Sequence, residues 1–258
     1  MVNLEVSIQS KMYSGHQQVL GAIQFSVNAG EFVAIVGPSG TGKSTLLNML
    51  SGLEPCSEGE VLLNQKPLSS HSSCDIGYIF QQPRLMPWLT VQENLRLVTP
   101  SASITAVNEQ LNKVGLAGKG KLYPKQLSGG MQRRVSIARA FLTPPELLLL
   151  DEPFVSLDAP NADRLRMLLL TLWQEHKPTV VFVTHDLNEA IQLADRIIFL
   201  SSAPGAVILD KDVDLPRPRV ESDTSFQYWK TQLLTRRPGL LEGEVCEPIL
   251  RSMTGGLA

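Results

Sequence analysis

The sequence predicts an α/β fold built around a largely parallel sheet, and three segments support this prediction. Residues 31–37 have the pattern of a buried strand that stops at a glycine, and residues 42–50 continue as a helix with leucines on one face. Residues 147–150 are an unbroken leucine run, which is typical of a strand covered on both faces. The valine-rich residues 179–184 follow a helical pattern at residues 162–176. Strands that alternate with helices in this way indicate a parallel sheet covered by helices.

The other predicted elements complete the α/β pattern and set out the domain organisation. In chain order they are strands around 59–63 and 76–80, a largely helical stretch at 91–140 with a break near 115–120, a short helix at 187–194 and a last strand at 196–200. Prolines after residue 210 predict an irregular or short-helical appendage. We therefore expect a main domain at residues 1–210, a helical subdomain inserted at about residues 85–143, and a tail of unassigned role at residues 211–258.

Composition and charge restrict the function. The chain of 258 residues has a formal net charge of −2, whereas a nucleic-acid-binding domain is usually basic, so no nucleic-acid partner is expected. No apolar run is long enough to span a bilayer, so we expect any membrane role to depend on a partner. Cys56, Cys74 and Cys246 have no metal-ligand or redox spacing and are expected to be ordinary small residues.

The glycine-rich segment after the first buried strand predicts a phosphate-binding loop. It satisfies the pattern G-x-x-x-x-G-K-[ST] between a strand and a helix. Glycines let backbone N–H groups approach phosphates closely, and the helix N-terminus adds a partial positive charge. We expect Lys43 to contact the β and γ phosphates of ATP, and Ser44 to offer its hydroxyl to Mg²⁺. The predicted nucleotide-binding residues are Gly37, Pro38, Ser39, Gly40, Thr41, Gly42, Lys43, Ser44 and Thr45.

Two carboxylates directly follow the leucine strand. Ligands of an open parallel sheet bind at the carboxyl ends of its strands, so Asp151 and Glu152 are predicted to face the nucleotide. We expect Asp151 to hold Mg²⁺ through a water molecule, and Glu152 to polarise the water that attacks the γ-phosphate. Taken alone, the pair is equally well explained as two solvated loop acids. The phosphate loop favours the catalytic interpretation.

A second glycine motif precedes the helix expected after residue 128. Ser128 is a good N-cap, and Gly129 and Gly130 expose backbone donors at the start of that helix. Such a helix start is a second anion-binding site, which one ATP on the first loop does not need. We infer that it serves the ATP of another copy of the chain.

With these motifs in order, the sequence resembles the ATP-binding-cassette (ABC) family over about residues 4–210, and Leu127-Ser128-Gly129-Gly130 matches the family signature. The resemblance implies a P-loop ATPase domain with a RecA-like core, an antiparallel β subdomain and an inserted helical signature subdomain. It also assigns roles to four further residues. Tyr13 matches the residue that stacks on adenine, Gln81 the residue that senses the γ-phosphate and Mg²⁺, Asp158 the D-loop aspartate, and His185 the switch histidine.

These matches have simpler alternatives. Tyr13 is also compatible with a packing aromatic, and His185 with a strand-end histidine that binds backbone. Gln82 follows Gln81, so the register of the glutamine match has a second solution. One position departs from the family pattern: Arg133 stands where a glutamine is common, which leaves the contacts of that helix open.

The resemblance also implies how such a protein works. Two copies form a head-to-tail homodimer around two ATP molecules, hydrolysis opens the dimer, and membrane permease subunits convert that motion into transport. Residues 80–95, Pro204-Gly205 and residues 215–219 resemble an importer subclass for nitrate, sulfonate or taurine, whose members also depend on an external solute-binding protein. The resemblance places the chain as a peripheral subunit at the cytoplasmic face of the inner membrane.

An apolar cluster between two prolines predicts where the permease docks. Leu85, Met86, Trp88 and Leu89 are expected to receive a cytoplasmic helix of the permease, because such clusters mark partner surfaces. The alternative is that Trp88 packs the inserted lobe against the core.

Three rival functions remain compatible with a P-loop. A non-transport ABC ATPase in DNA repair or translation usually has a long coiled-coil insertion or a second cassette, and this sequence has neither. A small-molecule kinase does not need the signature segment. A binding module that no longer hydrolyses ATP does not need Asp151, Glu152 and His185 together.

Overall fold

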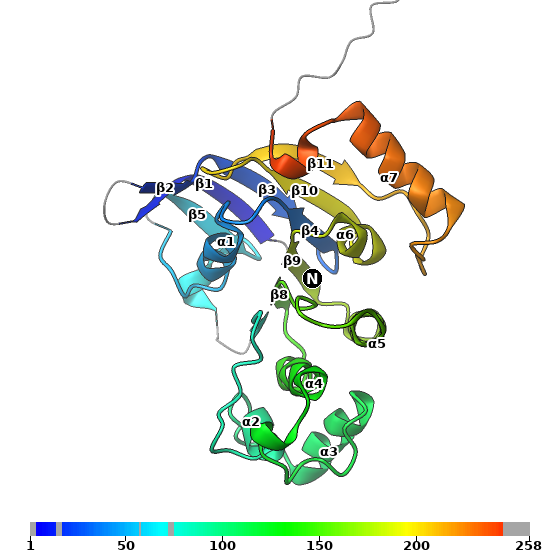
Figure 1. Ribbon diagram of the computed structural model, residues 1–258. Helices are drawn as coiled ribbons and strands as arrows, with labels where there is room; N and C mark the ends of the chain where they lie inside the picture. Colours follow the sequence, from blue (N-terminus) through cyan, green and yellow to red (C-terminus); the bar gives the residue numbers. More distant parts are fainter. Residues whose placement is uncertain (1–3, 14–16, 57, 72–74, 245–258) are drawn as a thin grey trace, which may run out of the picture.

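A six-stranded sheet forms the centre of the fold (Figure 1). The computed structural model describes residues 4–13, 17–56, 58–71 and 75–244. In spatial order the strands are β11 Val207–Asp212, β10 Arg196–Leu200, β4 Phe32–Val36, β9 Thr179–Thr184, β8 Leu147–Asp151 and β7 Ile76–Ile79. All neighbours are parallel except β10 and β11. The predicted α/β class is confirmed, and the apolar runs of β4, β8 and β9 are buried as a two-sided sheet requires.

A second, antiparallel sheet shares a hydrophobic core with the central one. Its strands are β1 Leu4–Tyr13, β2 Gln17–Leu20, β3 Ile23–Val27, β5 Glu58–Leu63 and β6 Lys66–Pro67. Leu4, Val6 and Ile8 of β1 are buried and alternate with exposed residues, so one face of this sheet lies on the core. That core also contains Leu47 of helix α1 Lys43–Leu50 and Leu149 of β8.

The helical stretch predicted at residues 91–140 forms a lobe to one side of the sheets (Figure 1). It contains α2 Val91–Arg96, α3 Ile104–Lys113 and α4 Gly129–Ala140. The side chains of Thr90, Ser103 and Ser128 each accept a hydrogen bond from a backbone N–H in the first turn. These N-caps fix where the helices begin, and the last of them places the predicted signature segment at the start of α4.

The C-terminal part is more ordered than an irregular or short-helical appendage. β11 crosses the boundary expected after residue 210, and α7 Thr224–Arg236 is a helix of 13 residues. Phe226 and Leu233 of α7 are seven positions apart, so they share one helix face. Both are buried in the same core as α5 Ala159–His176 and α6 Leu187–Leu193. The division into domains stays a prediction.

The remaining described elements are short. 3₁₀ helices lie at Leu68–Ser70, Pro124–Gln126 and Leu240–Glu242. Within the described ranges, no helix has the length and apolarity that a membrane span requires. Cys56 is a half-buried free thiol, whereas Cys74, Cys246 and the predicted tail after residue 244 lie outside the described residues.

Candidate functional site

The phosphate loop and the predicted catalytic residues lie at the carboxyl ends of four neighbouring strands. Strand β9 lies between β4 and β8, with Val36 opposite Thr184 and Asp151 opposite Val183. The phosphate loop follows β4, His185 follows β9, Glu152 follows β8, and Gln81 lies two residues beyond β7. The parallel register therefore brings together residues that are more than a hundred positions apart in the sequence.

The phosphate loop needs its glycines for two different reasons. Gly40 and Gly42 have φ values of +80° and +87°, in the left-handed region that favours glycine. A Cβ atom on Gly42 would lie 2.6 Å from the Leu20 side chain, so the loop also packs tightly against β2. Outside the loop, a Cβ atom on Gly205 would lie 2.2 Å from the Thr41 carbonyl oxygen. Gly205 thus supports the loop from behind, a role that the sequence pattern did not predict.

Lys43 lies within the curve of the loop. Its Nζ donates hydrogen bonds to the carbonyl oxygens of Gly37 and Pro38, at 2.9 and 2.7 Å. The residue is only 5% exposed. Burial lowers the pKa of its ammonium group, while the negative charges of Glu152 and Asp151 raise it by less. The loop therefore holds a desolvated cation, and an anionic ligand would interact strongly with it.

The residues predicted to hold Mg²⁺ are adjacent to each other. Ser44 Oγ donates a hydrogen bond to Asp151 Oδ1 at 3.0 Å. Burial, and then the charge of Glu152, raise the pKa of the Asp151 carboxyl, while the Ser44 hydrogen bond and Lys43 lower it. A hydroxyl and a carboxylate at this distance are hard oxygen donors of the kind that Mg²⁺ prefers. A cation there would also stabilise the charged form of Asp151.

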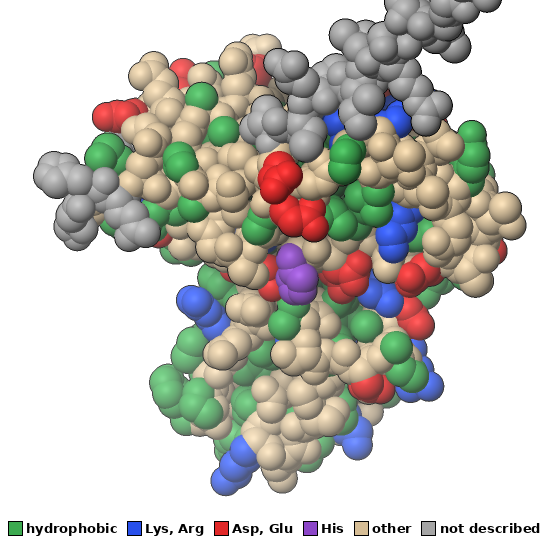
Figure 2. Space-filling model, turned by 45° about the horizontal axis from the view of Figure 1, so that its top comes forward, with side chains coloured by type: hydrophobic (Ala, Val, Ile, Leu, Met, Phe, Trp, Pro, Cys, Tyr) green, Lys and Arg blue, Asp and Glu red, His purple; other side chains and the backbone are tan. Residues whose placement is uncertain are grey.

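Glu152 and His185 face each other just beyond the carboxyl ends of β8 and β9. Glu152 Oε2 lies 3.3 Å from His185 Nδ1, and the side chains are 17% and 53% exposed, respectively. Glu152 has a φ of +42°, an uncommon conformation that often occurs at functional sites. Figure 2 shows a face on which a histidine and several acidic side chains cluster at the waist between the sheets and the helical lobe. A carboxylate beside an exposed imidazole can accept a proton from a water molecule bound between them and a phosphate.

Tyr13 lies beside the end of the phosphate loop. Its hydroxyl donates to the Glu54 carboxylate at 2.6 Å and lies 3.4 Å from Thr45 Oγ1. Burial and then the Glu54 carboxylate raise the pKa of the Tyr13 hydroxyl. The residue is 42% exposed, and Lys11 Nζ lies 5.4 Å from the centroid of its ring. The role of Tyr13 stays a prediction, as does that of the exposed Gln81.

The second glycine motif lies apart from the first. Helix α4, which begins at Gly129, belongs to the helical lobe, and Figure 1 shows it separated from α1. A Cβ atom added to Gly129 would meet nothing within 4 Å, and one on Gly130 would meet only Asn161, at 3.9 Å. Packing within this chain therefore does not demand either glycine. Asp158, at the N-cap of α5, accepts a hydrogen bond from that same Asn161 at 2.6 Å, so the predicted D-loop residue lies near the motif.

Two arginines of α4 connect the helical lobe to the site. Arg133 donates hydrogen bonds to the carbonyl oxygens of Pro153 and Val155, in the segment after Glu152. Arg139 donates to the carbonyl oxygens of Pro83 and Arg84, in the segment after Gln81, at 3.1 Å each. Arg133, which stands where the family commonly has glutamine, therefore makes defined contacts in this chain. The contacts of neither arginine were predicted, although Arg133 departs from the family pattern, because the partners are backbone atoms from distant segments.

The chain is similar to proteins that import sulfonates. A family model described as "ABC transporter" matches residues 20–155. The aliphatic sulfonates import ATP-binding protein SsuB of Bacillus cereus is 43% identical over 233 residues, which cover 89% of this chain and 92% of the relative. The protein of the same name from Pectobacterium atrosepticum is 44% identical over 222 residues, or 86% of this chain and 82% of the relative.

Solved structures of dimeric cassettes are similar as well. A dimeric post-hydrolysis state of an ATP-binding cassette bound to ADP and Pi matches with a TM-score of 0.72 and 34% identity. The match covers 84% of this chain and all of that one. A second structure, described as a dimeric bacterial ABC transporter cassette, gives a TM-score of 0.73 at the same identity.

Proposed function

This chain belongs to the ABC transporter family as an ATP-binding and ATP-hydrolysing subunit, and from that premise we propose that it energises the import of aliphatic sulfonates across a membrane. The observation that carries the proposal is the pairing of Glu152 with His185 beside the phosphate loop, in a chain so similar to sulfonate-import proteins. A role in DNA repair or translation has no comparable support.

In the proposed reaction, the phosphate loop binds ATP and Glu152 acts as the general base. Backbone N–H groups of the loop and the N-terminus of α1 surround the phosphates, and Lys43 Nζ leaves the Gly37 and Pro38 carbonyls to contact the β and γ phosphates. Glu152 accepts a proton from the attacking water, and His185 donates a hydrogen bond to the γ-phosphate. Tyr13 stacks on adenine.

Ser44, Asp151 and Gln81 are the residues that would hold Mg²⁺. Their oxygen atoms fit a magnesium ion, and the ion would neutralise the charge that develops on the transferred phosphoryl group. Ser44 and Asp151 already lie side by side, joined by a hydrogen bond.

A second copy of the chain completes each site in this proposal. Ser128, Gly129 and Gly130 of one copy contact the γ-phosphate of the ATP bound by the other, and Asp158 lies at the same interface. The open space around Gly129 supports this arrangement, since a phosphate can approach the N-terminus of α4 without a steric clash. The dimeric state of the similar cassettes supports it independently.

Growth on sulfonates tests the proposed function. Deletion of the gene from its host should abolish growth on an alkanesulfonate as the sole sulfur source and leave growth on sulfate unchanged. The wild-type gene should restore growth, and a Glu152→Gln version should not. Taurine as sulfur source and nitrate as nitrogen source are parallel arms that distinguish the substrates of the importer subclass. Unchanged growth of the deletion strain in all three arms would refute the importer assignment.

We also propose that permease subunits dock beside Gln81, at the cytoplasmic face of the membrane. Trp88 is 69% exposed, which argues against packing between the lobe and the core. The buried Asn94 fixes the backbone around it, since its side chain bonds the Met86 N–H at 2.8 Å and the Leu89 carbonyl at 3.1 Å. Tryptophan is enriched among the residues that dominate binding energy at protein interfaces, so an exposed Trp88 on an anchored segment favours a docking site here. An external solute-binding protein belongs to the same proposal.

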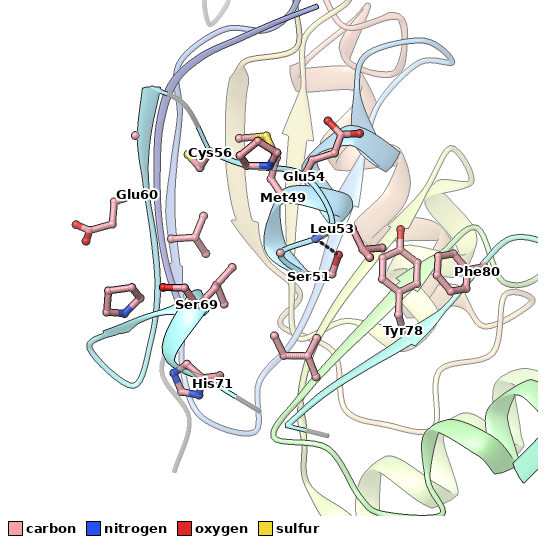
Figure 3. A pocket seen from close by; sticks show the side chains of 17 residues that line it. Met49, Ser51, Leu53, Glu54, Cys56, Glu60, Ser69, His71, Tyr78 and Phe80 are labelled. Atoms are coloured by element: carbon pink, nitrogen blue, oxygen red, sulfur yellow. Dashed lines mark hydrogen bonds between the residues drawn. The ribbon is translucent and has the colours of Figure 1, made fainter. Parts of the chain in front are cut away.

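The surface next to Phe80, which directly precedes Gln81, is hollowed. A cavity of about 680 Å³ lies next to the C-terminal end of α1, and Figure 3 shows Tyr78 and Phe80 on one side of it and Glu60 with Cys56 on the other. Tyr78 and Phe80 stack at 4.0 Å between ring centroids and lead directly to Gln81. The exposed Leu53 lies at the same cavity. A permease helix in this hollow would contact the strand that positions Gln81.

Replacement of Trp88 by aspartate should separate the chain from its permease. Truncation of a tryptophan hot spot costs roughly 2 kcal/mol or more, or about thirtyfold in Kd, and a charge adds a desolvation cost. Co-purification with a tagged permease measures the effect. Met167→Asp, at an exposed apolar position on α5, is the matched control and should leave the yield unchanged. Wild-type yield of the complex with Trp88→Asp would eliminate this surface as the docking site.

A further inference from the structure

The C-terminal segment contacts the helix that follows His185 at both of its ends. We define the strap as residues 215–230, which begin shortly after the end of β11 and continue into α7. Helix α6 begins two residues after His185, and its N-cap is Asp186, whose side chain accepts a hydrogen bond from the Asn188 N–H at 2.7 Å. A displacement of α6 would therefore move the loop that carries the imidazole.

At the start of α6, two strap residues hold one side chain. Asn188 Nδ2 donates to Glu221 Oε1 at 2.8 Å, and Lys230 Nζ donates to Asn188 Oδ1 at 2.7 Å. The amide of Asn188 thus has both its donor and its acceptor satisfied by the strap. Gln227 donates to the Glu221 carbonyl oxygen at 2.7 Å, which fixes the turn before α7.

At the end of α6, two strap arginines bind the carbonyl oxygens that a helix leaves without partners. Arg219 Nη1 donates to Ile191 O at 2.7 Å and to Ala194 O at 2.5 Å. Arg217 donates to the carbonyl oxygen of Leu193. Many helices are closed by a glycine directly after the C-cap, but the residue after the C-cap of α6 is Asp195, and the arginines supply donors to the last carbonyl oxygens. Burial, followed by the nearby Arg217, lowers the pKa of Arg219 to about 10, so it stays charged at neutral pH.

The strap also reaches the strand that leads into the phosphate loop. Arg217 Nη1 donates to Asp195 Oδ1 at 2.5 Å, and the other oxygen of that carboxylate accepts from the Phe32 N–H at 3.0 Å. Phe32 is the first residue of β4. One chain of contacts therefore joins the strap, the end of α6 and the strand before the loop.

We propose that the strap positions the switch histidine: Glu221 and Lys230 fix the start of α6, Arg217 and Arg219 fix its end, and together they set where the His185 imidazole lies relative to Glu152 and the γ-phosphate. These four side chains are positioning residues and make no contact with ATP. The inference rests on the proposed function, because it assumes that His185 takes part in hydrolysis. It assigns a role to residues 215–230, which belong to the tail of unassigned role.

A double variant that removes both contacts with Asn188 tests the strap. Glu221→Ala with Lys230→Ala should lower kcat for ATP by about tenfold to a hundredfold and leave KM unchanged, since misplacement of a catalytic group mainly affects the reaction step. The imidazole signal of His185 in ¹³C-histidine-labelled protein should shift. Glu221→Gln with Lys230→Arg keeps an acceptor and a donor at these positions, so it should restore both readouts.

The matched control removes one acid and one base elsewhere in the C-terminal part. Lys211 and Asp214 form an exposed ion pair at 3.8 Å, so Lys211→Ala with Asp214→Ala should leave kcat and the His185 signal unchanged. Thermal unfolding, measured in parallel, should give similar Tm values for the two alanine pairs.

Two contrary results have different meanings. Wild-type kcat in His185→Ala would refute the role of His185, and the inference would fail with it. Loss of activity in His185→Ala, together with wild-type kcat and an unshifted His185 signal in the Glu221/Lys230 alanine variant, would overturn the strap alone and leave the proposed function intact.

Discussion

Replacement of Glu152 by glutamine should lower the rate of ATP hydrolysis by about 10²–10⁴-fold, the range that a general base contributes. Glutamine has the same shape but cannot accept a proton, so the water between Glu152 and the γ-phosphate loses its base. The side chain faces His185 at 3.3 Å and not the loop carbonyls that surround Lys43, so ATP affinity should stay close to that of the wild type. Steady-state hydrolysis and equilibrium binding of a fluorescent ATP analogue measure the two effects separately.

The same strand provides a control for Glu152→Gln. Glu146 precedes β8 and Glu152 follows it, so Glu146→Gln removes an exposed carboxylate at the opposite end of the same strand. It should hydrolyse ATP at the wild-type rate. Normal turnover in Glu152→Gln would show that another group accepts the proton.

Replacement of Gly129 by aspartate should lower the rate of ATP hydrolysis by at least about a hundredfold, whereas ATP should still bind. In one copy the new side chain enters open space, and an acidic residue in the first turn of α4 is favourable toward the helix dipole, so the fold should be retained. In the dimer, the carboxylate would face the γ-phosphate of the partner's ATP. Like charges in contact cost several kcal/mol, and about 2.8 kcal/mol already corresponds to a hundredfold.

An acidic residue at another helix start separates this repulsion from a general charge effect. Thr105 is exposed in the first turn of α3, within the same lobe. Thr105→Asp should leave hydrolysis unchanged. Equal losses in Gly129→Asp and Thr105→Asp, or unchanged hydrolysis in both, would contradict a role of the α4 N-terminus in binding phosphate.

The sequence predicted the elements whose signal is local. The leucine run of β8 and the valine run of β9 were recognisable because a two-sided strand is apolar at every position. The phosphate loop was recognisable because a fixed spacing of glycines and Lys43 meets one geometric need. The alternation of Leu4, Val6 and Ile8 in β1 is also a local signal of a half-buried strand, but no strand was predicted there.

Contacts between distant segments were not predictable in the same way. Arg133 and Arg139 bind backbone carbonyls, which every sequence offers, so their side chains carry no mark of their partners. The strap has the same difficulty, since Lys230 meets Asn188 only because α7 packs on the core. Prolines near Arg217 suggested an irregular tail, whereas the apolar spacing of α7 determines a helix. The roles of the individual site residues stay predictions until they are tested.

The molar mass of Glu152→Gln protein with ATP and Mg²⁺ tests most directly whether each ATP site takes residues from two copies. Light scattering should give twice the 28.3 kDa of the single chain with nucleotide and the single-chain mass without it. Gly129→Asp in the same Glu152→Gln background should bind ATP and keep the single-chain mass. A double variant that forms the ATP-dependent dimer as readily as Glu152→Gln alone would contradict the shared site.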